Sequence, residues 1–370
     1  MSEYQYYEFQ TIDRPLTREE QAGISQLSSR VELSSTRAVF TYQYGDFRGD
    51  AKKVLAQYFD AMLYLANWGT KQLIFRFPKS LIDLKQVQPY GVEDIISFTT
   101  TGQYVILNIR FDDEGGGFWV DGEGTLDSFI ELRGDILRGD YRALYLAWLK
   151  ATESEGSESE EEPPVPPGLR TLSPALRDWA RFLEIDDHLL KVAAQASDKL
   201  ATSPDDAQAL RQAIAQLSRE ECNVYLLRLA QGELHLDMEI RTRLREFLGQ
   251  SPRTESAPRR KAMQLLRAAD QERKAEEKRQ AEEAEARRIA ELETLFQHQK
   301  QTWRAVEELI RKSNSSAYEQ AAALLAKLKQ AAALKGQEAD FETRLNELRE
   351  RYKTRSALKA RLREAGLIRL

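Results

Sequence analysis

An acidic, proline-rich run interrupts the chain before its middle. Residues 152–167 read TESEGSESEEEPPVPP, with six glutamates, four prolines in the last five positions and no basic residue. Such a run buries too little apolar surface to offset the entropy that is lost when a chain is ordered, and its charges repel one another. We therefore expect residues 152–168 to be a disordered linker between two parts that fold independently.

The two parts differ in composition. Of the 33 aromatic residues, 24 precede residue 151, and the rest of the chain is rich in alanine, leucine, glutamate, arginine and lysine. Charged residues make up 31% of the chain, which favours long solvated helices, and the net charge of −5 argues against a general binder of polyanions. The length of 370 residues predicts two or three domains.

Strand patterns dominate residues 1–151. Apolar and polar residues alternate near 4–12 and over 71–77, and residues 31–44 are rich in β-branched and aromatic side chains. Residues 95–111 predict a hairpin that turns at a Thr-Gly pair.

Helix signals lie between these strands. Thr17 and Glu20 have the spacing of a capping box, and Asp50 is expected to cap a helix whose apolar residues extend to Leu65. A further helix is expected over 126–150. Because the helices are few and the strands cluster late, we expect an α+β domain with an antiparallel-rich sheet and helices on one face. A doubly wound α/β sheet is disfavoured, since no glycine-rich phosphate loop follows the first strand.

Residues 169–250 predict an all-helical subdomain. Serine-proline pairs at 173–174 and 203–204, and a capping-box pair formed by Ser218 and Glu221, mark three helix starts. The expected helices cover 174–183, resuming over 186–196, and then 204–216, 219–231 and 237–249. The expected core residues are Trp179, Phe182, Leu189, Leu210, Leu226 and Phe247. Residues 251–258 are expected to be a second linker.

A long charged helix is expected over residues 259–312. Between Ala268 and Arg288 no apolar residue is larger than alanine, which predicts a helix exposed on nearly all sides. Beyond it, apolar residues recur in alternate steps of three and four, the spacing of a coiled-coil seam, with Gln299 at one position. The seam residues must be covered by the following helices or by another chain, and we expect them to bind a partner. They are Ile289, Leu292, Phe296, Trp303, Val306 and Ile310.

Residues 313–370 predict helical hairpins that end in a basic segment. Hairpins of this kind occur in tetratricopeptide-like arrays, but the consensus of those repeats is absent. The basic side chains are candidates for contact with nucleic-acid phosphates or with an acidic partner, and the alternative is a solvated face that offsets helix dipoles. They are Arg349, Arg351, Lys353, Arg355, Lys359, Arg361 and Arg363.

No catalytic, cofactor-binding or metal-binding residues are predicted. His188, His235 and His298 lie in separate helical regions, and the single cysteine, Cys222, excludes a thiolate zinc site. Motifs of nucleophile elbows, phosphate-binding lysine loops, zinc proteases and kinases are absent. Carboxylates between 112 and 123 flank three glycines, which fits either a divalent-cation site or a polar hairpin tip. Whether the protein is an enzyme stays open, and a non-enzymatic function is favoured.

The same features indicate a cytoplasmic protein. One cysteine permits no disulfide within the chain, which suits a reducing compartment. The first residues lack the apolar core of a signal peptide, and no run approaches 18 apolar residues. We expect no membrane contact.

The opening segment YQYYEFQTIDRPLT, with GDFRGD and LYLANWGTK further on, resembles an uncharacterised family of bacterial cytosolic proteins. This resemblance covers mainly the first part of the N-terminal region and implies no active site. Residues 318–367 are similar to the C-terminal tails of bacterial SWIM-type zinc-finger proteins. The cysteine and histidine ligands of that family are absent here, so the similarity implies no zinc. It suggests association with such proteins or with nucleic-acid machinery.

Three functional hypotheses follow. The first, which we favour, is a non-catalytic interaction or scaffold protein, an accessory subunit of a bacterial cytosolic complex that binds another chain or itself through its helical region. The second is an accessory nucleic-acid-binding protein that acts through the basic C-terminal helices. The third is an unrecognised hydrolase or nuclease in the N-terminal domain, built from carboxylates that the fold brings together.

Overall fold

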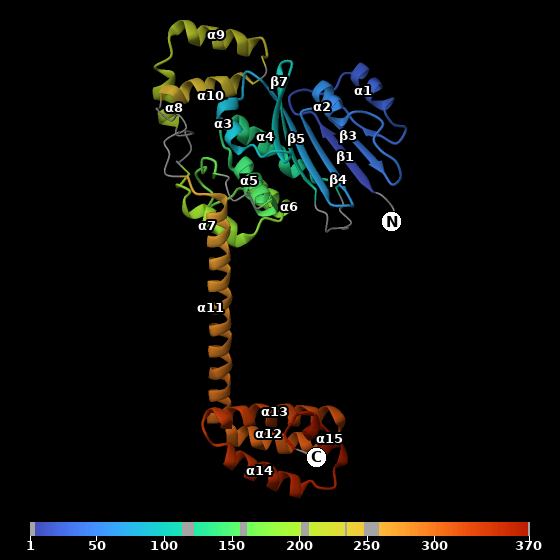
Figure 1. Ribbon diagram of the computed structural model, residues 1–370, viewed down its shortest axis with the longest axis vertical. Coiled ribbons are helices and arrows are strands. Elements are labelled where there is room, and N and C mark those ends of the chain that lie inside the picture. Colours follow the sequence, from blue (N-terminus) through green and yellow to red (C-terminus); the bar gives the residue numbers. More distant parts are fainter. Residues whose placement is uncertain are drawn as a thin grey trace. The chain divides into compact units, whose positions relative to one another are not determined.

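The computed structural model describes residues 4–112, 122–155, 161–200, 207–233, 235–247 and 259–368. Two compact units make up the chain, Met1–Glu272 and Arg273–Leu370. Figure 1 shows their helices and strands. The fold class is the predicted one, because an α+β part with an antiparallel sheet is followed by an all-helical part. One of the predicted segments, the linker at 251–258, lies outside the described residues.

Among the described residues, seven strands form one antiparallel sheet in the first unit (Figure 1). Their order is β2-β3-β1-β4-β5-β7-β6, and every neighbouring pair is antiparallel. The strands are β1 (Gln5–Gln10), β2 (Glu32–Leu33), β3 (Arg37–Tyr42), β4 (Ala61–Ala66), β5 (Thr70–Pro78), β6 (Ile96–Thr101) and β7 (Tyr104–Asp112). All of them except β4 fall where the sequence predicted strands.

Strand β4 corrects the predicted secondary structure. The sequence predicted one helix from Asp50 to Leu65, but α2 (Ala51–Tyr58) is followed by a strand that pairs with both β1 and β5. All six residues of β4 are buried, since the strand lies inside the sheet and both of its faces are covered. A short, wholly apolar run has no periodicity that distinguishes a buried strand from a helix.

Helices pack on both faces of the sheet, whereas the sequence predicted them on one. Met62 and Ile74 pack with residues of α1 (Arg18–Ser25) and α2. Their neighbours Leu63 and Leu73 point to the opposite face, because side chains alternate along a strand. The helices on that second face are α4 (Ile130–Leu137), α5 (Arg142–Glu155), α6 (Pro174–Phe182) and α7 (Asp187–Gln195). The short helix α3 (Leu84–Val87) contributes Val87 to the same cluster.

The predicted helix starts at Thr17, Ser173 and Ser218 are confirmed by their capping hydrogen bonds. The predicted start at 203–204 lies outside the described residues. Thr17 with Glu20, and Ser218 with Glu221, form reciprocal capping boxes at the starts of α1 and α9 (Arg219–Ala230). The side chain of Ser173 accepts a hydrogen bond from a backbone N–H in the first turn of α6. These side chains satisfy N–H groups that have no partner inside a helix.

The acidic, proline-rich run differs from the predicted linker. Residues 156–160 lie outside the described residues, but the remainder of the run packs into the first unit. Glu162 is 2% exposed, accepts a hydrogen bond from the Tyr145 hydroxyl at 2.5 Å and pairs with Arg260 at 2.6 Å. The Tyr90 hydroxyl donates to the main-chain carbonyl of Pro164 at 2.8 Å.

This packing corrects the predicted boundaries at 151 and 169. A single hydrophobic cluster contains residues from before and after the run, including Trp148 on α5 and Trp179 on α6. The indole N–H of Trp179 donates to the carbonyl of Ala143 at 3.0 Å. The composition of the run could not predict this packing, because the residues that contact the run come from distant parts of the chain.

Helices α8 (Ala207–Ile214), α9 and α10 (Leu236–Phe247) form what we call the helical appendage. Its last helix buries Leu236 and Leu244, and Met238 packs against the main cluster of the first unit. Helix α9 buries none of its residues. Leu226, predicted to be a core residue, is 63% exposed, so that prediction is wrong, whereas the predicted core residue Leu189 on α7 is buried.

The second unit has its own core. The predicted continuous helix over 259–312 is two helices, because His298 separates α11 (Ala262–Gln297) from α12 (Gln299–Arg311). Three further helices complete the unit, namely α13 (Ser315–Leu334), α14 (Glu338–Arg351) and α15 (Ser356–Glu364). Apolar residues of α12 to α15 form one buried cluster.

Candidate functional site

A network of buried charges fixes the segment that follows β1. The carboxylate of Asp60, between α2 and β4, accepts hydrogen bonds from the guanidinium of Arg76 on β5 at 2.8 and 3.3 Å. Its other oxygen accepts the backbone N–H groups of Ile12 and Asp13 at 2.7 and 3.0 Å. Both oxygens of Asp60 are therefore satisfied, as a buried carboxylate requires.

Arg133 of α4 completes this network. Its terminal nitrogens donate to the two carboxylate oxygens of Asp13 at 2.8 and 2.9 Å, and its Nε donates to the main-chain carbonyl of Arg76 at 2.9 Å. One terminal nitrogen also lies 3.8 Å from the carboxylate of Asp60. Two arginines thus balance two aspartates, and their hydrogen bonds offset the cost of removing these charges from water.

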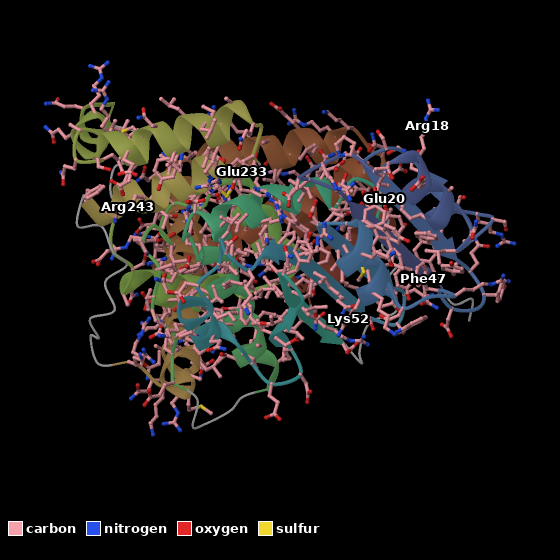
Figure 2. All side chains as sticks on the ribbon, turned by 90° about the horizontal axis from the view of Figure 1, so that it is seen from above. Arg18, Glu20, Phe47, Lys52, Glu233 and Arg243 are labelled. Atoms are coloured by element: carbon pink, nitrogen blue, oxygen red, sulfur yellow. The ribbon has the colours of Figure 1, made fainter. Side chains whose placement is uncertain are left out.

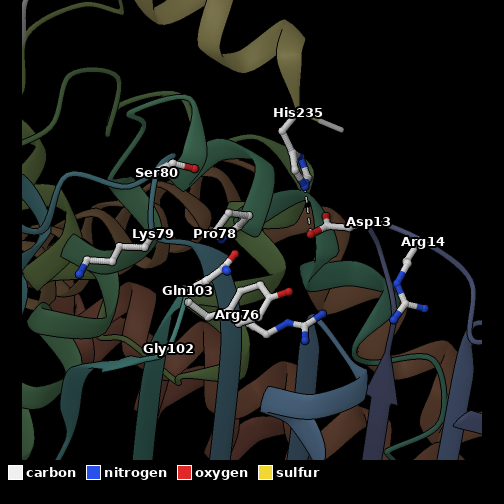
Figure 3. A pocket seen from close by; sticks show the side chains of 10 residues that line it. Asp13, Arg14, Arg76, Pro78, Lys79, Ser80, Gly102, Gln103 and His235 are labelled. Carbon is white, nitrogen blue, oxygen red and sulfur yellow. Dashed lines mark ion pairs between the residues drawn. The ribbon is translucent and has the colours of Figure 1, made fainter. Parts of the chain in front are cut away.

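His235 reaches the network from the helical appendage. It directly precedes α10, and its Nε2 lies 3.0 Å from Oδ2 of Asp13 (Figure 3). Its φ of 63° is in the left-handed region, which costs a residue other than glycine about 1–3 kcal/mol. The contact with Asp13 is therefore made by a residue whose backbone is held in an unfavourable conformation.

Asp13 stays ionised in this environment. Burial disfavours its charged form, but the hydrogen bonds from His235 and Arg133 outweigh that effect and lower the pKa of Asp13 to about 2. The appendage is therefore joined to the first unit through a carboxylate that is negatively charged at neutral pH.

A pocket of about 580 Å³ lies beside the network. Its basic lining residues are Arg14, Arg76, Lys79 and His235, and its one acidic lining residue is Asp13. The guanidinium of Arg76 lies over the ring of Tyr104, 4.4 Å from its centroid, a cation–π arrangement. The other lining residues are Pro78, Ser80, Gly102 and Gln103.

A second candidate site is the apolar surface of α9. Four of its large apolar side chains are between 48% and 63% exposed, and Ile214 at the end of α8 is 48% exposed as well. We call these four side chains the exposed apolar residues of α9. They are Val224, Leu226, Leu227 and Leu229.

The predicted partner-binding seam is largely covered within the second unit. Trp303, Val306 and Ile310 on α12 are buried in the cluster that α13, α14 and α15 complete. The covering helices were one of the two alternatives that the sequence left open. A partner has no access to this part of the seam unless the unit unfolds. On α11, Leu292 is buried, Phe296 is partly buried against the same cluster, and Ile289 has intermediate exposure.

Part of the predicted basic surface serves the fold of its own unit. Arg355 donates to the main-chain carbonyl of Ile310 and to the hydroxyls of Ser313 and Tyr318. This arginine therefore ties the start of α15 to the end of α12 and the start of α13. Its interaction inside the unit competes with any contact to a phosphate.

The other basic residues of the segment are more accessible. Pairs within the unit join Arg351 to Glu307 at 2.9 Å, Arg361 to Glu364 at 2.6 Å and Lys353 to Glu350 at 3.9 Å, and Arg349 donates to the Asn346 side chain at 2.9 Å. For Lys359 and Arg363, no side-chain partner occurs among the described residues. Nucleic-acid binding through these helices stays a prediction.

The loop carboxylates give no described site. Asp112 pairs with Arg110 at 2.8 Å and accepts a hydrogen bond from the Thr70 hydroxyl at 2.6 Å. Asp113, Glu114 and Asp121 lie outside the described residues, so a cation site there stays a prediction. In the parts of the chain that the structure describes, His, Cys, Asp and Glu side chains form no group of three or more that suits a metal ion.

Sequence reasoning missed the charged network. The sequence predicted only that His235 lies in a helical region, and its contact with Asp13 joins residues 222 positions apart. One signal was available, because Arg76 stands between Phe75 and Phe77 in an apolar strand and a charge in such a strand needs a partner. The identity of that partner depends on the fold.

Comparisons with protein-family models, curated proteins and solved structures return no match for this chain. The two family resemblances noted from the sequence therefore stay predictions. Among the described residues, no helix combines the length and apolar character that crossing a bilayer requires.

Proposed function

We propose that the protein is a non-catalytic interaction protein that self-associates through α9. The observation that carries this proposal is the exposure of the apolar residues of α9, four large side chains of one helix. Single apolar residues are normal on a protein surface, whereas several that gather on one element favour a contact site.

Polar groups around α9 already have partners inside the appendage. Arg228 pairs with Glu233 at 2.6 Å and with Glu239 at 2.5 Å, and Arg243 pairs with Glu221 at 3.0 Å. Figure 2 labels Glu233 and Arg243 in this part of the first unit. These ion pairs tie α9 to α10. What α9 offers to a partner is apolar surface, whose removal from water is favourable.

A second copy of α9 suits this surface. Cys222, Leu226 and Leu229 follow one another at steps of four and three residues, a spacing with which two helices pack along a shared seam. The contact is isologous, the commonest arrangement in dimers.

Light scattering during size-exclusion chromatography of the full chain tests this proposal. We expect a dimer, and we expect the variant Leu226→Ser/Leu229→Ser to be a monomer with an unchanged circular dichroism spectrum. Leu334→Ser is the matched control, because Leu334 on α13 is also exposed, at 43%. A wild-type monomer at every concentration, or a dimer that survives the double substitution, would contradict self-association through α9.

A further inference from the structure

We propose that the pocket beside Asp13 and His235 binds a small oxyanion, the phosphoryl or carboxylate group of a metabolite-sized ligand. This proposal is independent of self-association. Four of the lining side chains are basic and one is acidic, a composition that favours an anion. The oxygens of an ionised phosphoryl or carboxylate group act mainly as hydrogen-bond acceptors, so binding depends on which donors in the pocket are available.

The charge balance of the pocket leaves a positive surplus. Lys79 has no partner of opposite charge among the described residues. Asp13 does not repel an incoming anion as a bare carboxylate would, because its charge is shared with a guanidinium. The paired lining residues are Arg14 with Glu20, Arg76 with Asp60, and Asp13 with Arg133.

Four lining side chains hold donors that form no hydrogen bond with any described residue. They are the ammonium of Lys79, the hydroxyls of Ser80 and Tyr104 and the amide of Gln103. Lys79 and Ser80 directly follow β5. Gln103 lies in the turn between β6 and β7, and Tyr104 is the first residue of β7. The backbone N–H of Lys79 donates to the carbonyl of Gln103 at 2.8 Å, which fixes these two segments to each other. The donors therefore stand on a rigid frame.

Figure 3 shows how the labelled side chains lie around this space. His235 and Asp13 stand on one side, and the guanidinium of Arg76 and the amide of Gln103 face them from the other. The ammonium of Lys79 extends away from His235. Because Lys79 is exposed and flexible, its side chain can turn towards an anion without breaking a contact.

The size of the pocket sets the class of ligand. A volume of about 580 Å³ falls inside the range of about 300–1,000 Å³ that is usual for small-molecule sites, and it exceeds what a bare ion fills. The shared chemistry of phosphoryl and carboxylate groups is the planar or tetrahedral array of acceptor oxygens, which arginine and lysine recognise. The remainder of the ligand would lie against Pro78 and the ring of Tyr104.

Isothermal titration calorimetry of the full chain at low ionic strength tests the proposal, with sulfate as the tetrahedral probe and citrate as the carboxylate probe. We expect saturable binding of at least one probe in a ratio of one per chain. Ser80→Asp places a negative charge in the pocket and should abolish binding. Lys79→Gln should weaken it about tenfold, the effect of losing one charge-assisted hydrogen bond.

Lys52→Gln is the matched control, since Lys52 is an exposed lysine on α2 (Figure 2). We expect it to bind the probes as the wild type does. All three substituted residues are exposed, and an unchanged thermal midpoint verifies that each variant folds. Stronger binding of sulfate identifies a phosphoryl-bearing ligand, and stronger binding of citrate a carboxylate. The proposal is overturned if neither probe binds saturably, or if Ser80→Asp and Lys79→Gln bind the probes as well as Lys52→Gln.

Discussion

Helices α9 and α12 carry comparable apolar side chains but differ in what covers them. On α12, Val306 and Ile310 are 0% exposed because α13, α14 and α15 pack over them. On α9, Leu226 and Leu229 are more than 60% exposed. An apolar pattern on a helix shows that the face needs cover, and it does not say which element provides that cover.

The contacts between neighbouring helices explain the difference. Helix α13 meets α12 through apolar residues such as Leu325, which is completely buried. Helix α10 meets α9 through ion pairs, with Arg228 bound to Glu239 and Arg243 bound to Glu221. Exposed ion pairs of this kind hold two helices together with little gain in free energy. The apolar residues of α9 are left over for another contact.

The largest predicted effect is the loss of stability when a buried ion pair is broken, measured against the loss for an exposed pair. Asp60→Ala should lower the free energy of unfolding of the first unit by about 3–5 kcal/mol, because it leaves the buried guanidinium of Arg76 without the carboxylate that it pairs with. Glu307→Ala removes the exposed partner of Arg351 and should change stability by less than about 1 kcal/mol. Urea unfolding followed by circular dichroism measures both values. Equal losses of stability in the two variants would mean that burial does not make an ion pair more important for stability.

The next prediction tests how much the burial of an apolar side chain contributes to stability. Leu325→Ala should destabilise the second unit by about 2–5 kcal/mol, since the substitution leaves a cavity in a closed core. The same unfolding experiment measures it, with the exposed Leu334→Ala as a control on the same helix. A loss below about 1 kcal/mol would indicate that the core of the second unit is loosely packed.

Acid should weaken the first unit through Asp13. The folded-state pKa of about 2 lies below the ordinary value of 3.8, so the stabilisation is present above pH 4 and is lost as the pH falls through the folded pKa. The expected loss between pH 5 and pH 2 is about 2 kcal/mol from this group. Unfolding free energies of the wild type and Asp13→Asn across this range check it. A wild-type slope that Asp13→Asn leaves unchanged would assign the acid sensitivity to other carboxylates.

The smallest predicted effect completes the comparison between α9 and α13. Leu226→Ala makes the same change as Leu325→Ala but on an exposed side chain, so it should alter the unfolding free energy of the dissociated chain by less than about 0.5 kcal/mol. Dilution until light scattering shows a monomer provides the right sample. A large loss of stability in that monomer would show that Leu226 is covered in solution by its own chain.

The sequence predicted the features that local physics controls. Capping side chains such as Thr17 and Ser218, and the alternation over β5 and β7, depend on residues a few positions apart. Strand β4 was missed because its wholly apolar sequence is equally compatible with a helix. The charged network was missed because Asp60, Arg76 and Arg133 meet only in the folded chain.

The burial of Glu162 has a practical consequence for anyone who divides this protein. Fragments that stop at residue 151 would lose the cover that Trp179 and its neighbours give to α5, and they should aggregate when expressed alone. If the two sides of the acidic run are produced as separate polypeptides in one cell, they should instead find each other and rebuild the shared core.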